Sequence, residues 1–338
     1  MQKNTLLIIF VLCFNFFEVK SQIYPQYIKT LKSHKYNISS SIFSEDGRFV
    51  ASSSLDGTIK IWESKTGKLI RTLRGYSHEI TCIDFDPYGK YIVASYVDKY
   101  IKIWNINRGE IIRSIKAHRD EVTCVKYSPD GTYFISSSKD NKIKFWDVET
   151  GKRLKTLKEH SDFVNSLDFS KDGKYFVSVS DDETVKLWRT DKKKSLNTFY
   201  GHKKNVISVA MSPDGRYIAS GGADNLIIVW EVETVGIRYI LKGHRGKVNA
   251  LQFSKDGNYL ASASSDKLLK IWRLKSGKEI LSMEDHKASV NTVDFGVNSR
   301  FIATGSNDKT IKLWDFINWI TEYSNYKKKI GEELQNQE

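Results

Sequence analysis

The residues best suited to chemistry are serines, histidines and aspartates at fixed distances from a tryptophan. In the third copy of the pattern they are His118, Ser136 and Asp140, ahead of Trp146. A hydroxyl, an imidazole and a carboxylate are the groups of a hydrolytic triad, in which the imidazole takes the proton of the nucleophilic hydroxyl. The same groups also suit a closed hydrogen-bond chain, because an indole N–H only donates, a hydroxyl donates and accepts, and a carboxylate accepts.

These residues belong to a repeat with a constant period. Tryptophan recurs every 42 residues from Trp62 to Trp314 without insertion or deletion, and an aspartate precedes each one by six residues. A hydroxyl stands ten residues before the tryptophan, and a histidine 28 residues before it, in every copy but the second. Besides the third copy, the complete sets are His34, Ser52, Asp56 and Trp62; His160, Ser178, Asp182 and Trp188; His202, Ser220, Asp224 and Trp230; His244, Ser262, Asp266 and Trp272; and His286, Thr304, Asp308 and Trp314. Near-identical groups wedged between repeats cannot all face a substrate, so we interpret them as a structural polar network and predict no catalytic residue.

The elements that carry this network are short strands. In the third copy, the alternation of apolar residues and the turn residues between them predict strands over 122–127, 133–138, 143–146 and 154–157. Large apolar side chains lie on both faces of this four-stranded unit, so each unit needs a neighbour on either side. Closing the array into a ring supplies those neighbours and leaves only short, protected edges.

The motifs at these positions resemble those of the WD-repeat β-propeller family. They include the Gly-His starts at 201–202 and 243–244, the Ser-Pro-Asp-Gly turns at 128–131 and 212–215, and the Trp-Asp ends such as 146–147. The resemblance covers about residues 23–315. It implies an all-β, seven-bladed β-propeller of four-stranded antiparallel blades around a central channel, used as a rigid interaction platform. We assign this domain to residues 22–315 and expect a strand at 27–31 to complete the last blade.

The second copy departs from the pattern in two members of the polar network. Tyr76 stands in place of the histidine and Ala94 in place of the serine, with Tyr96 two residues further on. We therefore expect the second blade to be held by aromatic packing.

The two ends of the chain lie outside the repeats. Residues 1–21 have the layout of a signal peptide: a lysine, an apolar run too short to span a bilayer comfortably, and small residues before the expected cut. This predicts a secreted or periplasmic protein with no stable membrane span, although an uncleaved N-terminus would anchor it to a membrane. At the other end, apolar residues at helical spacing predict an amphipathic helix over about 316–335, within a tail at 316–338 that packs on the propeller or docks a partner.

Charge and cysteine content narrow the range of partners. The net charge of +13 favours anionic partners such as an acidic surface or a glycan, and export argues against nucleic acid. Much of the excess comes from a lysine two residues before most of the tryptophans, which we expect to form a ring of solvated ends. Cys82 and Cys124 occupy equivalent places in neighbouring repeats and are expected to be buried free thiols, with a disulfide left open for an oxidising compartment. No metal-ligand cluster or phosphate loop appears, so we predict no metal and no cofactor.

The resemblance also implies where a partner binds. Proteins with similar repeats use one rim of the channel, at the residue before each turn aspartate and near the start of each first strand. The partner-binding candidates carried over in this way, together with one aromatic residue beside them, are Ser39, Leu55, Val97, Thr123, Lys139, Phe163, Asn165, Asp181, Asn249, Asn291 and Asn307. The sequence therefore favours a non-enzymatic, exported protein-interaction scaffold, with an envelope- or glycan-binding module, or a cytosolic scaffold if residues 1–21 are not a signal, as alternatives.

Overall fold

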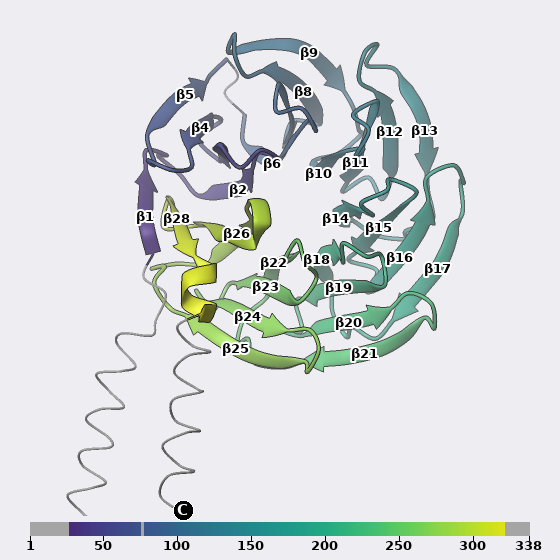
Figure 1. Cartoon of the computed structure of the whole chain (residues 1–338). Helices are drawn as coiled ribbons and strands as arrows, with labels where there is room; N and C mark the ends of the chain where they lie inside the picture. Colours follow the sequence, from purple (N-terminus) through teal and green to yellow (C-terminus); the bar gives the residue numbers. More distant parts are fainter. Residues whose placement is uncertain (1–26, 76–77, 322–338) are drawn as a thin grey trace, which may run out of the picture.

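The computed structural model describes residues 27–75 and 78–321, which form a closed ring of seven four-stranded antiparallel sheets (Figure 1). The first three blades are β2 (Ile38–Phe43), β3 (Phe49–Ser54), β4 (Ile59–Glu63) and β5 (Leu69–Leu73); β6 (Ile80–Phe85), β7 (Tyr91–Tyr96), β8 (Tyr100–Asn105) and β9 (Glu110–Lys116); and β10 (Val122–Tyr127), β11 (Tyr133–Ser138), β12 (Ile143–Asp147) and β13 (Arg153–Leu157). The strands of the third blade are those that its alternation of apolar residues predicts, within one residue at each end.

The same order continues through the later blades. They are β14 (Val164–Phe169), β15 (Tyr175–Ser180), β16 (Thr184–Arg189) and β17 (Ser195–Tyr200); β18 (Val206–Met211), β19 (Tyr217–Gly222), β20 (Ile227–Glu231) and β21 (Gly236–Leu241); and β22 (Val248–Phe253), β23 (Tyr259–Ser264), β24 (Leu269–Arg273) and β25 (Lys278–Met283). The seventh blade combines β26 (Val290–Phe295), the 3-10 turn η1 (Val297–Ser299), β27 (Phe301–Ser306) and β28 (Thr310–Asp315) with β1 (Tyr27–Lys32).

The ring is closed by a strand from the other end of the propeller. β1 pairs antiparallel with β28, so that Leu31 lies opposite Ile311 and Lys32 opposite Thr310. Figure 1 shows β1 alongside β28 at this junction. β1 is the strand that the spacing places at 27–31, and it satisfies the outer edge of β28.

The core lies between blades. Between the third and fourth blades, Phe145 meets Phe176 edge to face at 5.6 Å, and Phe176 stacks on Trp188 at 5.8 Å. Because every sheet is covered on both faces in this way, the blades cannot shift independently. The ring is therefore a rigid frame for the loops at its two ends.

The segment that follows the last blade packs against the propeller. Residues 316–321 are helical, and the backbone N–H of Asn318 bonds the Asp315 carboxylate at 3.1 Å, which caps this turn. Phe316 and Trp319 are buried against Tyr259 and Phe295 of the last two blades. The rest of the helix predicted over 316–335, and the signal peptide predicted at 1–21, lie outside the described residues. Within the described residues, no helix is long and apolar enough to cross a membrane.

Candidate functional site

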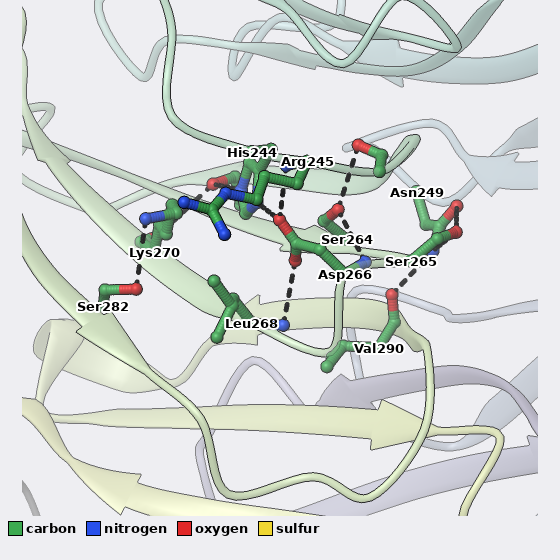
Figure 2. Close-up of polar contacts among 12 residues, drawn as sticks. His244, Arg245, Asn249, Ser264, Ser265, Asp266, Leu268, Lys270, Ser282 and Val290 are labelled. Carbon is green, nitrogen blue, oxygen red and sulfur yellow. Dashed lines mark hydrogen bonds and ion pairs between the residues drawn. The ribbon is translucent and has the colours of Figure 1, made fainter.

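Two loops of every blade meet on one side of the ring, which we call the network face because the polar network lies beneath it. In the sixth blade these loops are residues 243–247, before β22, and residues 265–268, between β23 and β24 (Figure 2). They are tied together by a bond from the backbone N–H of Ser265 to the carbonyl of Lys247 at 2.9 Å. The hairpins that follow the inner strands lie at the other end of the ring, which we call the opposite face.

The polar network of the sixth blade is a single chain of hydrogen bonds. The indole N–H of Trp272 donates to the Ser262 hydroxyl, that hydroxyl lies 2.8 Å from Nε2 of His244, and Nδ1 of His244 lies 2.8 Å from the Asp266 carboxylate. The same carboxylate accepts the backbone N–H of Arg245 at 2.9 Å and of Leu268 at 3.0 Å (Figure 2). One aspartate therefore fixes both loops of the blade to its buried tryptophan.

The other complete copies repeat this geometry. In each of them the shortest distance from Nδ1 of the histidine to the aspartate carboxylate lies between 2.8 and 3.0 Å. The hydroxyl accepts the indole N–H at 2.7 to 3.0 Å in the blades of Trp62, Trp146, Trp188, Trp230 and Trp314. These hydroxyls, on Ser52, Ser136, Ser178, Ser220 and Thr304, are fully buried. The triad-like groups therefore face one another inside the blades.

The network also sets the charge state of its members. Burial is the largest effect on Asp266 and would raise its pKa, but the hydrogen bonds from His244 and from two backbone N–H groups outweigh it and lower the pKa to about 2. Burial lowers the pKa of His118 below its ordinary value despite the bond to Asp140. At Asp140 burial is the largest single effect, but the hydrogen bonds from His118 and from the backbone N–H of Arg119 together outweigh it and lower the pKa of that carboxyl. In the third blade a neutral imidazole therefore faces an ionised carboxylate at neutral pH.

In the second blade, where Ala94 replaces the serine, a different residue accepts the indole N–H of the buried tryptophan. Tyr96 is completely buried, and its hydroxyl lies 3.2 Å from the indole nitrogen of Trp104. The expectation of aromatic packing alone was therefore incomplete, because the tyrosine hydroxyl takes the place of the missing serine. Tyr76 lies outside the described residues.

The lysines before the tryptophans are not the solvated ring that their charge led us to expect. Lys60, Lys102 and Lys270 are buried, and each ammonium group reaches a hydroxyl on the neighbouring outer strand, as in the 3.1 Å bond from Lys270 to Ser282 (Figure 2). Lys144 instead donates to the carbonyl of Ala117 at 2.6 Å. Burial lowers the pKa of Lys144. Their aliphatic stems pack between the strands and their ammonium groups form hydrogen bonds within the blade, so these lysines add little positive charge to the outer surface.

The rim candidates on the inner strands lie at β-bulges and reach the next blade. Asn165 donates to the Val206 carbonyl at 2.7 Å, Asn249 to the Val290 carbonyl at 2.8 Å, and Asn291 to the Ile38 carbonyl at 2.8 Å. Each lies where the register of its strand shifts, which turns the side chain sideways. The hydroxyl of Thr123 reaches the Val164 carbonyl in the same way, whereas the Ser39 hydroxyl bonds that of Ser53 at 2.9 Å.

The candidates in the turns are more varied. Lys139 pairs with Glu121 at 2.6 Å, the Asp181 carboxylate accepts from Asn165 at 2.6 Å, and Asn307 accepts from Asn291 at 2.6 Å. Leu55 and Val97 are half-buried, and Phe163 is exposed. The structure thus brings all the candidates to the network face. There the apolar side chains of Leu55, Val97 and Phe163 lie among asparagines that join neighbouring blades.

The channel contains a group of residues that the sequence reasoning missed. Asp84, Lys126, Asp168 and Asp294 occupy equivalent positions on four inner strands and line a cavity of 620 Å³. Burial raises the pKa of all three carboxyls, that of Asp294 to about 6, and each accepts a backbone N–H of a neighbouring blade, as in the 2.7 Å bond to Phe43. Their 42-residue spacing was a signal that could have found them. Within the described residues, no three His, Cys, Asp or Glu side chains are arranged to hold a metal ion.

Comparison with protein families now identifies the repeat. The model of the WD domain, G-beta repeat (WD40), matches seven times, at residues 25–63, 67–105, 109–147, 151–189, 193–231, 236–273 and 277–315. The chain belongs to the WD-repeat family. No curated protein matches the chain as a relative. WD-repeat propellers generally act as protein-interaction scaffolds.

Proposed function

We propose that this WD-repeat propeller is a non-enzymatic scaffold that binds a protein partner through its network face. One observation carries the proposal: near-identical ties fix six of the seven turns, all but that of the second blade, and the residues that lead the seven turns all differ. Those residues are Leu55, Val97, Lys139, Asp181, Ala223, Ser265 and Asn307. A rigid frame that displays different side chains at equivalent points presents a surface specific to one partner.

The arrangement of the triad-like groups supports a structural role for them. The serine hydroxyls are fully buried and each already accepts an indole N–H, so a substrate carbonyl has no approach to them. The network therefore stabilises the scaffold and contributes no chemistry.

We further propose that the protein is exported. The support is the signal-like composition of residues 1–21, and a cytosolic scaffold is the alternative. Mass spectrometry of the N-terminal peptide from native cells tests this directly. A chain that begins near Gln22 supports export, whereas a retained Met1 or Gln2 excludes a cleaved signal.

A protein partner and an anionic glycan are separated by one charge reversal. Asp181 lies on the network face, and Asp181→Lys should abolish capture of a protein partner while sparing, or strengthening, binding to an anionic polymer. The matched control is Glu149→Lys, because Glu149 is exposed in a loop of the opposite face. Loss of the captured protein with Asp181→Lys but not with Glu149→Lys, at unchanged melting temperature, supports the scaffold. Equal capture by both variants contradicts binding at this face.

A further inference from the structure

The network face carries unpaired positive charge on four adjacent blades. The loops of the fifth, sixth, seventh and first blades expose a set of cations that we call the basic arc: Lys203, Lys204, Arg245, Lys247, Lys267, Lys287, Lys309 and Lys35. Among the described residues, none of these eight side chains forms a salt bridge. The exposed acids beside them are Glu284 and Asp285, and Asp285 lies 3.9 Å from Lys312. The network aspartates add one carboxylate to every blade alike, so they do not change how the charge of these four blades compares with that of the other three.

The polar network holds the backbone of four of these cations in place. The backbone N–H groups of Lys35, Lys203, Arg245 and Lys287 each donate to the aspartate of their own blade, at 2.8 to 3.1 Å. In Figure 2, Arg245 and Asp266 lie together in this way on the sixth blade. The charges therefore start from fixed points at regular intervals around the ring, which lowers the entropy lost when a partner binds.

The other half of the same face has acids and cations mixed together. The second, third and fourth blades present Glu79, Asp120, Asp162, Asp181 and Glu183 in their loops. Arg119, Lys99 and Lys142 stand among them, and Glu121 pairs with Lys139. Arg74, Lys116 and Lys158 are also exposed at the edge of these loops, so the network face is divided into a half of mixed charge and a basic half.

On the opposite face of the ring some charges are paired within single turns, whereas exposed cations such as Lys65, Lys171 and Lys275 form no salt bridge with any described residue. Arg48 lies 4.0 Å from Asp46, Lys174 lies 3.6 Å from Asp172, and Arg189 lies 2.9 Å from Asp191. Exposed pairs of this kind contribute little to stability, but they cancel the field that a partner would meet. Unpaired cations therefore occur on both faces, and those of the basic arc differ in that the polar network fixes the backbone of four of them.

A hollow lies at one end of the basic arc, where β1 closes the ring. It has a volume of 500 Å³, and its lining includes four lysines, Lys32, Lys287, Lys309 and Lys312, with hydroxyls of Thr30 and Ser33. Asp285 and Asp308 also line it, and Asp308 is already bonded to His286 at 2.8 Å. Lys312 already donates to the Asp285 carbonyl at 2.8 Å, so the ammonium groups of Lys32, Lys287 and Lys309 are the donors that suit one carboxylate or phosphate group.

We propose that the network face binds an acidic segment of a protein partner along the basic arc, with one carboxylate or phosphate of that segment in the hollow at β1. This inference rests on the scaffold function proposed above and names the chemistry of its partner. A uniformly anionic glycan fits less well, because its other charges would meet the exposed carboxylates of Glu79, Asp120 and Asp162 on the same face. A protein can carry an acidic segment for one half and basic or apolar groups for the other, where Leu55 and Phe163 lie.

The test compares two full-length variants with the same change in charge. The variant of the basic arc is Lys203→Glu/Arg245→Glu/Lys287→Glu, and the control on the opposite face is Lys174→Glu/Arg216→Glu/Lys275→Glu. The probes are a fluorescein-labelled dodecapeptide of alternating Glu and Ser, the same peptide with its serines phosphorylated, and a heparin oligosaccharide of equal charge, each measured by anisotropy at several salt concentrations.

We expect the arc variant to weaken peptide binding by on the order of tenfold or more and to reduce its salt dependence, with the control variant close to the unmodified protein. Stronger binding of the phosphorylated peptide assigns the hollow to phosphate, and equal binding assigns it to carboxylate. Equal losses in both variants would overturn the inference. No peptide binding by the unmodified protein at about 1 mM protein in roughly physiological salt, or heparin binding tighter than that of both peptides, would also overturn it. Capture of the same native partner by the arc variant would reject the inference and leave the scaffold function standing.

Discussion

Removal of a single buried hydroxyl tests the role of the polar network. In the sixth blade, Ser262 accepts the indole N–H of Trp272 and lies 2.8 Å from Nε2 of His244, and all three groups are buried. Ser262→Ala leaves two buried polar groups without this partner, each at about 1–3 kcal/mol, so the free energy of unfolding should fall by about 2–6 kcal/mol. The seventh blade provides the matched control, because Thr304 has the same place and accepts from Trp314 at 3.0 Å.

Ser262→Thr should therefore change stability by less than about 1 kcal/mol, since it keeps the hydroxyl. Urea unfolding followed by far-ultraviolet circular dichroism and by tryptophan fluorescence compares the two variants. A midpoint for Ser262→Ala that equals that of Ser262→Thr would refute the reasoning, because the hydroxyl would then contribute only volume. A double variant, Ser262→Ala/Ser264→Tyr, copies the arrangement of the second blade and should recover part of the loss.

Three further predictions follow from other parts of the ring. Burial raises the pKa of Asp294 to about 6, so between about pH 4 and 6 the folded chain keeps a proton that the unfolded chain has released. Stability therefore falls as the pH rises through that window. Asp294→Asn should flatten the dependence of the melting temperature on pH over this range, and an unchanged slope would contradict the assignment. Deletion of residues 22–32 removes β1 and should open the ring, which a variant with unchanged cooperative melting would refute. The Cys82 and Cys124 thiols lie 3.7 Å apart on neighbouring inner strands, so diamide, which takes up the two thiol hydrogens, should join them within one chain. Intact mass spectrometry should show a loss of about two mass units without a dimer, and thiols that remain titratable would contradict the contact.

The ring itself could be predicted because its signals are periodic. The tryptophans at a constant 42-residue interval define the blades, and the apolar residue Leu31, in series with the fourth strands, indicates the strand that closes the ring. The hydrogen-bond inventory of tryptophan, serine, histidine and aspartate was sufficient to pair them. These features depend on local chemistry that recurs in almost every copy.

The surface could not be predicted to the same extent. Lys144 was expected to be solvated because lysine usually is, but its stem packs between strands and its ammonium group meets the Ala117 carbonyl. Tyr96 was read as a packing residue because the distance between its hydroxyl and Trp104 depends on three-dimensional placement. The basic arc was missed for a similar reason, since its cations are far apart in sequence and only the ring brings their loops to one face.

Cross-linking mass spectrometry of the native full-length protein in cells tests the central claim most directly. A short amine-reactive cross-linker reports both faces, because Lys203, Lys247 and Lys287 are exposed on the network face and Lys65, Lys174 and Lys275 on the opposite face. We predict that one protein partner is captured reproducibly and that its cross-links fall on the first three lysines, with acidic residues of the partner close to the linked sites. Cross-links confined to the second three lysines, or no protein partner at all, would contradict the account.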